Sequence, residues 1–161
     1  MTTPTPPTVT KALFLYGVAL KSAERAAIET AVEQAGGRRL VLVGSKNISQ
    51  FEVALLDLPG KQRLKFMFDG RDRFVQAKYQ GTITDEKHRN VVAALVERYG
   101  AAKETSVSGV KSYGWAFDDG LALTYRLEDS RLGQSSFSLS YVDIASEAAL
   151  RDAVKANDEK H

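Results

Sequence analysis

The chain has 161 residues, of which 43% are hydrophobic and 26% charged, and its formal net charge at pH 7 is +2. This length and composition are typical of one globular domain, or of two small halves that share a core. A two-charge excess gives no general reason to expect nucleic acid binding, and the absence of cysteine excludes disulfides, thiolate metal sites and thiol catalysis.

Residues 1–10 are rich in threonine and proline, a composition that favours extended chain without packing, so we expect a disordered tether there. No stretch approaches the roughly 18 apolar residues of a membrane span. Such tethers are frequent in exported bacterial proteins, and the prediction is therefore a periplasmic or cell-envelope location, with the cytoplasm as the alternative.

Residues 11–81 are predicted to form a first α+β unit. Its helix runs from an N-cap at Ser22 to Ala35 and is stopped by two glycines. Strands are expected on either side of this helix, at residues 11–16, 40–43, 51–55, 63–68 and 73–79.

The strand at residues 63–68 has the clearest period-2 pattern in the first unit. Leu64, Phe66 and Phe68 are predicted to line its buried face. The side chains that alternate with them are predicted to face solvent, and they are Arg63, Lys65 and Met67.

Residues 82–156 are predicted to form a second unit in the same order. Thr84 is the N-cap of its helix, Gly100 is the stop, and the predicted inner face comprises Val92, Leu95, Val96 and Tyr99.

One-sided strands follow the second helix, and they begin at Tyr113, Leu121 and Phe137. Asp119-Gly120 predicts a type I′ hairpin turn between the first two. A last helix starts near Ser146 and is expected to pack through Ala149, Leu150, Ala153 and Val154, before a frayed tail at 157–161.

A glycine-stopped helix followed by one-sided strands thus occurs twice along the chain. The predicted fold is α+β, with two helix-plus-antiparallel-sheet repeats and a C-terminal helix. The most economical arrangement is two sheets, each faced by one helix, and the sequence leaves open whether they are continuous.

Residues with catalytic potential are few and scattered. His88 fits a boundary position on its helix, and His161 is the last residue of the sequence. The acidic residues fall in predicted turns without a calcium-loop pattern, and no nucleophile elbow or phosphate-binding glycine motif is present. We therefore expect no enzyme activity, metal or cofactor.

Residues 13–18 and 111–117 loosely resemble the two aromatic strand motifs of RNA-recognition domains. In that fold one helix and one strand separate the two motifs, whereas here two helices and several strands lie between them. Tyr113, Trp115 and Phe117 are better explained as one buried strand face. A nucleic-acid-binding module using basic and aromatic side chains is kept as the alternative function.

Basic residues cluster around the strand at residues 63–68, namely Arg63, Lys65, Arg71 and Arg73. Such a cluster is either a solvated sheet edge or an electrostatic contact for an acidic partner.

The segment 14–25 entering a helix, followed by the strand–turn–strand at 66–74, resembles uncharacterised bacterial envelope proteins. These look related to the tandem-repeat fold of the β-lactamase inhibitor protein and to small outer-membrane assembly lipoproteins. The resemblance implies non-catalytic protein binding through an exposed sheet face, and it assigns no residue roles.

The predicted function is therefore binding of another protein, as an inhibitor, an immunity factor or a component of envelope assembly or secretion. The predicted binding residues lie on the exposed strand faces of both units: Arg63, Lys65, Met67, Thr124, Arg126 and Ser138.

Overall fold

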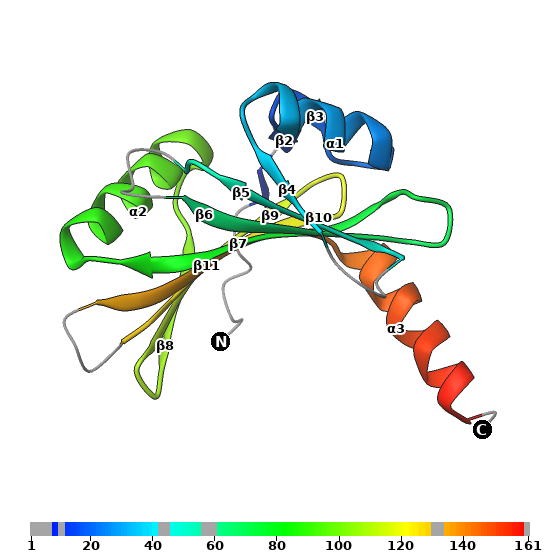
Figure 1. Ribbon diagram of the computed structural model, residues 1–161. Helices are drawn as coiled ribbons and strands as arrows, with labels where there is room; N and C mark the ends of the chain where they lie inside the picture. The colour runs from blue at the N-terminus through cyan, green and yellow to red at the C-terminus, as the bar shows by residue number, and fades with distance from the viewer. Residues whose placement is uncertain (1–7, 10–11, 42–45, 56–60, 130–133, 160–161) are drawn as a thin grey trace.

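The computed structural model describes residues 8–9, 12–41, 46–55, 61–129 and 134–159 (Figure 1). The predicted tether at residues 1–10 therefore lies outside the described residues, except for Thr8 and Val9.

The described residues form helices and strands in the following order along the chain. They are β1 (Thr8–Val9), β2 (Phe14–Leu15), β3 (Val18–Ala19), α1 (Arg25–Gln34), β4 (Arg38–Leu40), β5 (Ile48–Val53), β6 (Gln62–Phe68), β7 (Phe74–Ile83), α2 (Asp85–Tyr99), β8 (Lys103–Val107), β9 (Val110–Phe117), β10 (Leu121–Glu128), β11 (Ser135–Asp143) and α3 (Ile144–Glu159).

The main sheet is continuous and runs in the order β8-β9-β10-β11-β7-β6-β5-β4. All of these neighbours are antiparallel, while β1 adds to β9 in parallel beside β8. Helix α1 with β4–β7 precedes α2 with β8–β11, and the last strands of the two sets, β7 and β11, pair at the centre. The α+β class is confirmed, and the two strand sets form one sheet instead of two. The predicted boundary at residues 81–82 falls inside β7.

One face of the sheet carries the hydrophobic core. Helices α1 and α2 both lie on this face, and the β2–β3 hairpin packs there through Leu15, Tyr16 and Val18 (Figure 1). The core strands contribute alternate residues, as the period-2 pattern predicts: Phe51, Val53, Leu64, Phe66, Phe68, Ala77, Tyr79, Trp115, Phe117, Leu121, Leu123, Tyr125, Leu127, Phe137, Leu139 and Tyr141.

The opposite face is called the open face below. It consists of the strand side chains that alternate with the core residues, and α3 leaves the sheet on this side (Figure 1). Its central members are Arg63, Lys65, Met67, Gln76, Lys78, Gln80, Ser112, Gly114, Ala116, Ala122, Thr124, Arg126, Ser136, Ser138, Ser140 and Val142.

The N-terminal strand predicted at 11–16 is wrong. Phe14 and Leu15 instead form a small hairpin with β3 through a two-residue turn, Tyr16-Gly17, in which both residues have positive φ, 52° and 79°. Leu13 and Leu20, at the two ends of this hairpin, are buried in the core. The apolar segment therefore packs against the main sheet and is not one of its strands.

The predicted cap of α1 is also wrong. Ser22 has a φ of 57°, and the helix begins at Arg25 with Glu24 at the N-cap. Its first turn is held by the turn between β6 and β7, because the Arg25 N–H donates to the Asp72 carbonyl. A backbone acceptor far away in sequence thus replaces the local side-chain cap.

Helix α2 keeps its predicted ends, with Thr84 accepting a hydrogen bond from the Lys87 N–H and Gly100 at the C-cap. Its buried stripe is rotated from the prediction, since His88, Val91 and Leu95 are buried and Val96 is exposed. The buried stripe thus begins with a polar residue, His88, which the apolar pattern did not include.

The turn between β9 and β10 differs from the predicted type I′ turn. The Gly120 N–H donates to the Phe117 carbonyl and only Gly120 has positive φ, so Asp118 and Asp119 are the central residues of a longer loop.

Helix α3 begins at Ile144 and continues to Glu159, so residues 157–159 of the expected frayed tail are helical. Ala149 and Ala153 are exposed and Leu150 is half-buried, so the expected packing of this helix is only partly present among the described side chains.

His88 connects α2 to the sheet. Its Nδ1 lies 3.1 Å from the Tyr125 hydroxyl, and the two rings stack at 5.5 Å. Burial is the main cause that lowers the pKa of His88, and Lys111 lowers it further, against the opposing effect of Asp85. The ring is therefore held neutral inside the folded protein.

This lowered pKa predicts a loss of stability in mild acid. The unfolded chain binds the proton more readily, so the stabilisation is complete above the ordinary pKa of about 6.5 and declines as pH falls through it towards the lower folded value. Thermal unfolding at several pH values between about 7.5 and 5.5 should show a steeper fall in midpoint for the wild type than for His88→Gln. His161→Gln is the control and should keep the wild-type slope; equal slopes for all three proteins would contradict the prediction.

Candidate functional site

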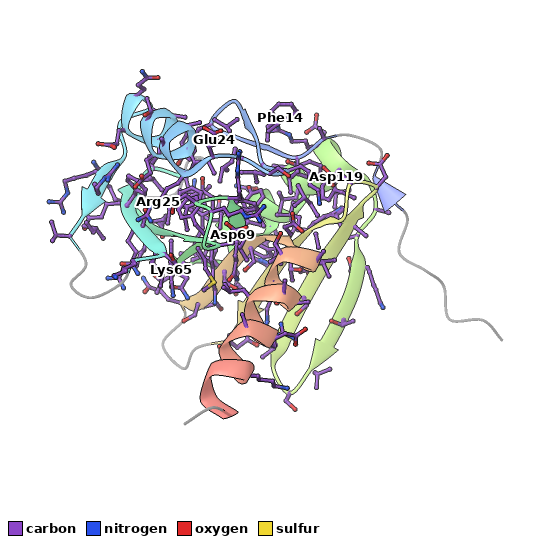
Figure 2. All side chains as sticks on the ribbon, turned by 90° about the vertical axis from the view of Figure 1, so that its right-hand side faces the viewer. Phe14, Glu24, Arg25, Lys65, Asp69 and Asp119 are labelled. Atoms are coloured by element: carbon purple, nitrogen blue, oxygen red, sulfur yellow. The ribbon has the colours of Figure 1, made fainter. Side chains whose placement is uncertain are left out.

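The six predicted binding residues lie on the open face of one sheet. Arg63, Lys65 and Met67 come from β6, Thr124 and Arg126 from β10, and Ser138 from β11. Figure 2 shows Lys65 on the side of the sheet away from α1. The continuous sheet thus brings together residues that the sequence assigned to separate halves.

The strand register arranges these residues in rows that cross the sheet. One row runs Glu52, Arg63, Gln80, Ser138, Arg126 and Ser112. The next row runs Gln50, Lys65, Lys78, Ser140, Thr124 and Gly114. Neighbouring strands are about 4.8 Å apart, so Arg63 and Arg126 begin about 14 Å from each other across three strand spacings.

The centre of the open face is positively charged. Arg63, Lys65, Lys78 and Arg126 form no ion pair with any residue that the structure describes. Glu52, at the β5 end of the first row, is already bound by Arg38 at 2.6 Å. The central cations therefore remain available to groups outside the described chain.

Lys78 and Gln80 were missed as site residues in the sequence. Lys78 lies in the predicted strand 73–79 and Gln80 directly follows it, but that strand was not assigned two faces. The alternation with buried Ala77 and Tyr79 is the pattern that could have placed both on the open face.

Arg71 and Arg73 do not belong to the basic face that the sequence suggested. A register shift at Met67/Phe68 and the following turn direct them towards α1. There Arg73 pairs with Glu24 at 3.2 Å and donates to the Ser22 carbonyl, so it is part of the helix attachment.

A groove of about 480 Å³ lies where β6 and β7 meet the start of α2. It includes Glu52, Arg63, Gln80, Thr84 and Lys87, and no histidine. Its one carboxylate, Glu52, is engaged by Arg38, so the groove presents no unengaged acid–base pair. Within the described ranges, no group of three or more histidine, aspartate or glutamate side chains could hold a metal ion.

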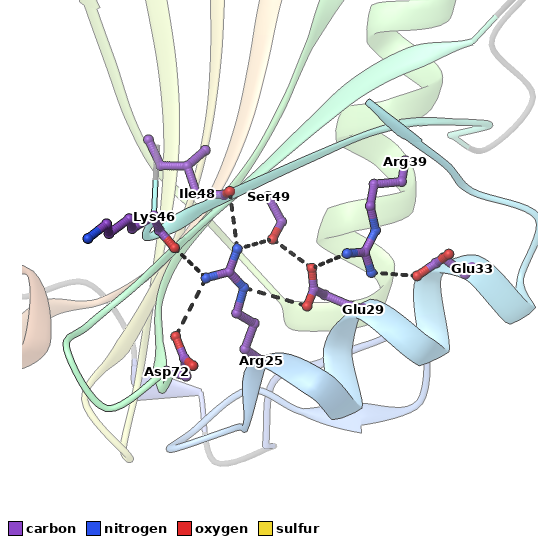
Figure 3. Close-up of polar contacts among 8 residues, drawn as sticks. All are labelled: Arg25, Glu29, Glu33, Arg39, Lys46, Ile48, Ser49 and Asp72. Carbon is purple, nitrogen blue, oxygen red and sulfur yellow. Dashed lines mark hydrogen bonds and ion pairs between the residues drawn. The ribbon is translucent and has the colours of Figure 1, made fainter. Parts of the chain in front are cut away.

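A second polar cluster surrounds Arg25 at the start of α1 (Figure 3). The guanidinium donates to the carbonyls of Lys46 and Ile48 and to the Ser49 hydroxyl, and it pairs with Glu29 at 3.5 Å. Glu29 accepts from the same hydroxyl at 2.8 Å and is 3.1 Å from Arg39.

The charges of Arg25, Glu29 and Arg39 are paired with one another, and Arg25 also lies 3.5 Å from Asp72 in the β6–β7 turn (Figure 3). The Arg25 guanidinium is 5.1 Å from the centre of the Phe68 ring. The cluster thus joins α1, β5 and the β6–β7 turn. We assign it a structural role.

A further titratable cluster consists of three tyrosines. The Tyr16 and Tyr79 hydroxyls are 3.1 Å apart, and the Tyr79 ring meets Tyr141 edge to face. Burial raises the pKa of all three, so they remain neutral phenols and supply no nucleophile near neutral pH.

Comparisons with known proteins leave the site to be interpreted from its own geometry. No protein-family profile matches the chain, and no curated protein or solved structure shows significant similarity to it. No helix among the described residues has the length and apolar character needed to cross a membrane.

The Arg25 cluster predicts unequal effects of two arginine substitutions. Arg25→Met should lower the free energy of unfolding by about 2–3 kcal/mol, because it leaves two carbonyls and the largely buried Glu29 with fewer donors. Arg39→Met, at a half-exposed side chain, should cost less than about 1 kcal/mol. Urea denaturation of both variants measures the difference, and similar losses would argue against the structural role assigned to Arg25.

Proposed function

We propose that this protein is a non-catalytic binding module whose open face docks on an acidic surface of another protein. In this proposal it serves as an inhibitor, an immunity factor or a component of envelope assembly or secretion, in the periplasm or cell envelope. The resemblance to envelope proteins and the threonine- and proline-rich start of the chain support this location.

The observation that carries the proposal is the charge of the open face. Arg63, Lys65, Lys78 and Arg126 project from three strands on one side of the sheet, and none has an ionic partner among the described residues. A positive patch of this kind complements a negative one, which guides encounter and fixes orientation. The small neighbouring side chains of β9, β10 and β11 would let a partner approach the strands closely.

The non-catalytic part of the proposal is supported by the state of the titratable groups. His88 is held against Tyr125 within the core, and the tyrosines are neutral. The one carboxylate in the groove of about 480 Å³ is bound by arginine. These groups stabilise the fold or one another.

A duplicated origin of the two units forms part of the proposal. A helix followed by four strands occurs twice, and the strand order on one side of the β7–β11 pair mirrors the order on the other. The mirrored order supports duplication, and it places equivalent strands of both units on one binding face.

Nucleic acid is the alternative partner, and the placement of the aromatic residues gives it little support. Trp115 and Phe117 are buried on the core face, with Tyr113 packed beside them. Stacking of bases needs exposed rings next to the basic groups. The open-face residues named above include no aromatic side chain.

The proposal predicts that reversing two charges on the open face removes partner binding. A partner is captured with the wild-type protein, identified, purified and titrated with the Arg63→Glu/Lys65→Glu variant. We expect the affinity to fall by about tenfold or more, with a reduced salt dependence, because the substituted carboxylates face an acidic surface.

The matched control is Arg71→Glu/Arg89→Glu, which changes the charge equally on the helix side of the molecule. It should bind as the wild type does. Unchanged partner binding by the open-face variant would refute the proposed function. The proposed function is equally wrong if the open face binds only single-stranded RNA and added salt abolishes that binding.

A further inference from the structure

Two lysines face each other at the centre of the open face. Lys65 of β6 and Lys78 of β7 are direct cross-strand partners in the antiparallel register. Their flanking residues, Leu64 and Phe66 on one strand and Ala77 and Tyr79 on the other, are buried in the core, so both lysines project to the open side. Directly opposed residues have Cβ atoms about 5 Å apart.

This pairing costs stability in the isolated protein. Like charges directly opposite each other on a sheet are destabilising. Neither lysine forms an ion pair with a described residue, and their row neighbours, Gln50 and Ser140, are uncharged. The repulsion is therefore not relieved by the described part of the chain.

The two lysines enclose a small polar hollow. Together with Met67 and Gln76 they line a space of about 100 Å³ on the open face. Two ammonium groups supply six N–H donors, and the Gln76 amide can add more. A carboxylate, with two oxygens and about four acceptor positions, can receive hydrogen bonds from both lysines at once.

We propose that Lys65 and Lys78 together hold one aspartate or glutamate carboxylate of the protein that docks on the open face. This assignment rests on the proposed function and specifies its central contact. A carboxylate bound between the lysines turns their repulsion into two charge-assisted hydrogen bonds. The hollow is lined by two lysines, a methionine and a glutamine, and its volume of about 100 Å³ fits a single carboxylate.

The first test uses a defined probe, an acetylated ten-residue peptide of alternating glutamate and alanine. It is titrated into the full chain while the lysine ammonium and backbone amide signals are followed by NMR. We expect the Lys65 and Lys78 signals to shift together, and the same peptide with glutamine in place of glutamate to cause no shift. A response to inorganic phosphate at lower concentration than to the peptide would overturn the carboxylate assignment.

Substitutions then test whether the two lysines act as one unit. Lys65→Gln and Lys78→Gln should each weaken peptide binding by about tenfold, and the double variant should bind little worse than either. Lys103→Gln, a lysine in edge strand β8, should bind as the wild type does. Additive losses from the two substitutions, or a loss with Lys103→Gln equal to theirs, would overturn the assignment.

A stability measurement separates the lysine pair from the rest of the face. Lys65→Glu and Lys78→Glu should each raise the unfolding midpoint by about 1–3 °C, because a carboxylate then faces the remaining lysine, and each should abolish peptide binding. A lower midpoint in both variants would show that the pair is not strained. If the peptide and stability tests fail while Arg63→Glu/Lys65→Glu still loses the purified partner, the assignment of Lys65 and Lys78 to one carboxylate is wrong and the proposed function stands.

Discussion

The structure depends on the pairing of β7 with β11, which runs from Ser135 opposite Ile83 to Val142 opposite Gln76. This ladder joins two four-strand sets into one sheet, so the alternation of side chains stays in phase across it. A slip of one residue would move the core residues of one half to the solvent side. Both helices can then cover a single core, and the opposite face becomes one surface instead of two.

Patterns within a single element were predictable from the sequence. The alternation in β6 and the caps of α2 are set by residues close together in the chain, and both were predicted correctly. The start of α1 was missed because its first N–H is bound by the carbonyl of Asp72, which lies far along the chain in the β6–β7 turn. Likewise, the run at Leu13–Leu15 has the composition of a strand, but a tight turn at Tyr16-Gly17 folds it into a hairpin.

The candidate site was predictable only in part for the same reason. Arg63 and Lys65 could be assigned to an exposed face from their own strand. Their relation to Arg126 and Ser138 depends on the central pairing, and the opposition of Lys65 to Lys78 depends on the β6–β7 register. That register includes a shift at Met67/Phe68, which no local pattern indicates. The same shift separates Arg71 and Arg73 from Lys65, which precedes them in sequence, and from Lys78, which follows them.

In the proposed function, the two faces of the sheet divide stability and recognition between them. The core face, with α1, α2 and the Arg25 cluster, contains nearly all the buried apolar side chains, so substitutions there act on folding. The open face contributes little burial and retains an unfavourable pair of charges. A protein can keep such a local cost when the rest of the fold supplies ample stability. Since each open-face side chain alternates with a core residue on its strand, the scaffold fixes the positions of the basic groups, and in the proposed function their identity can change with the partner without disturbing the core.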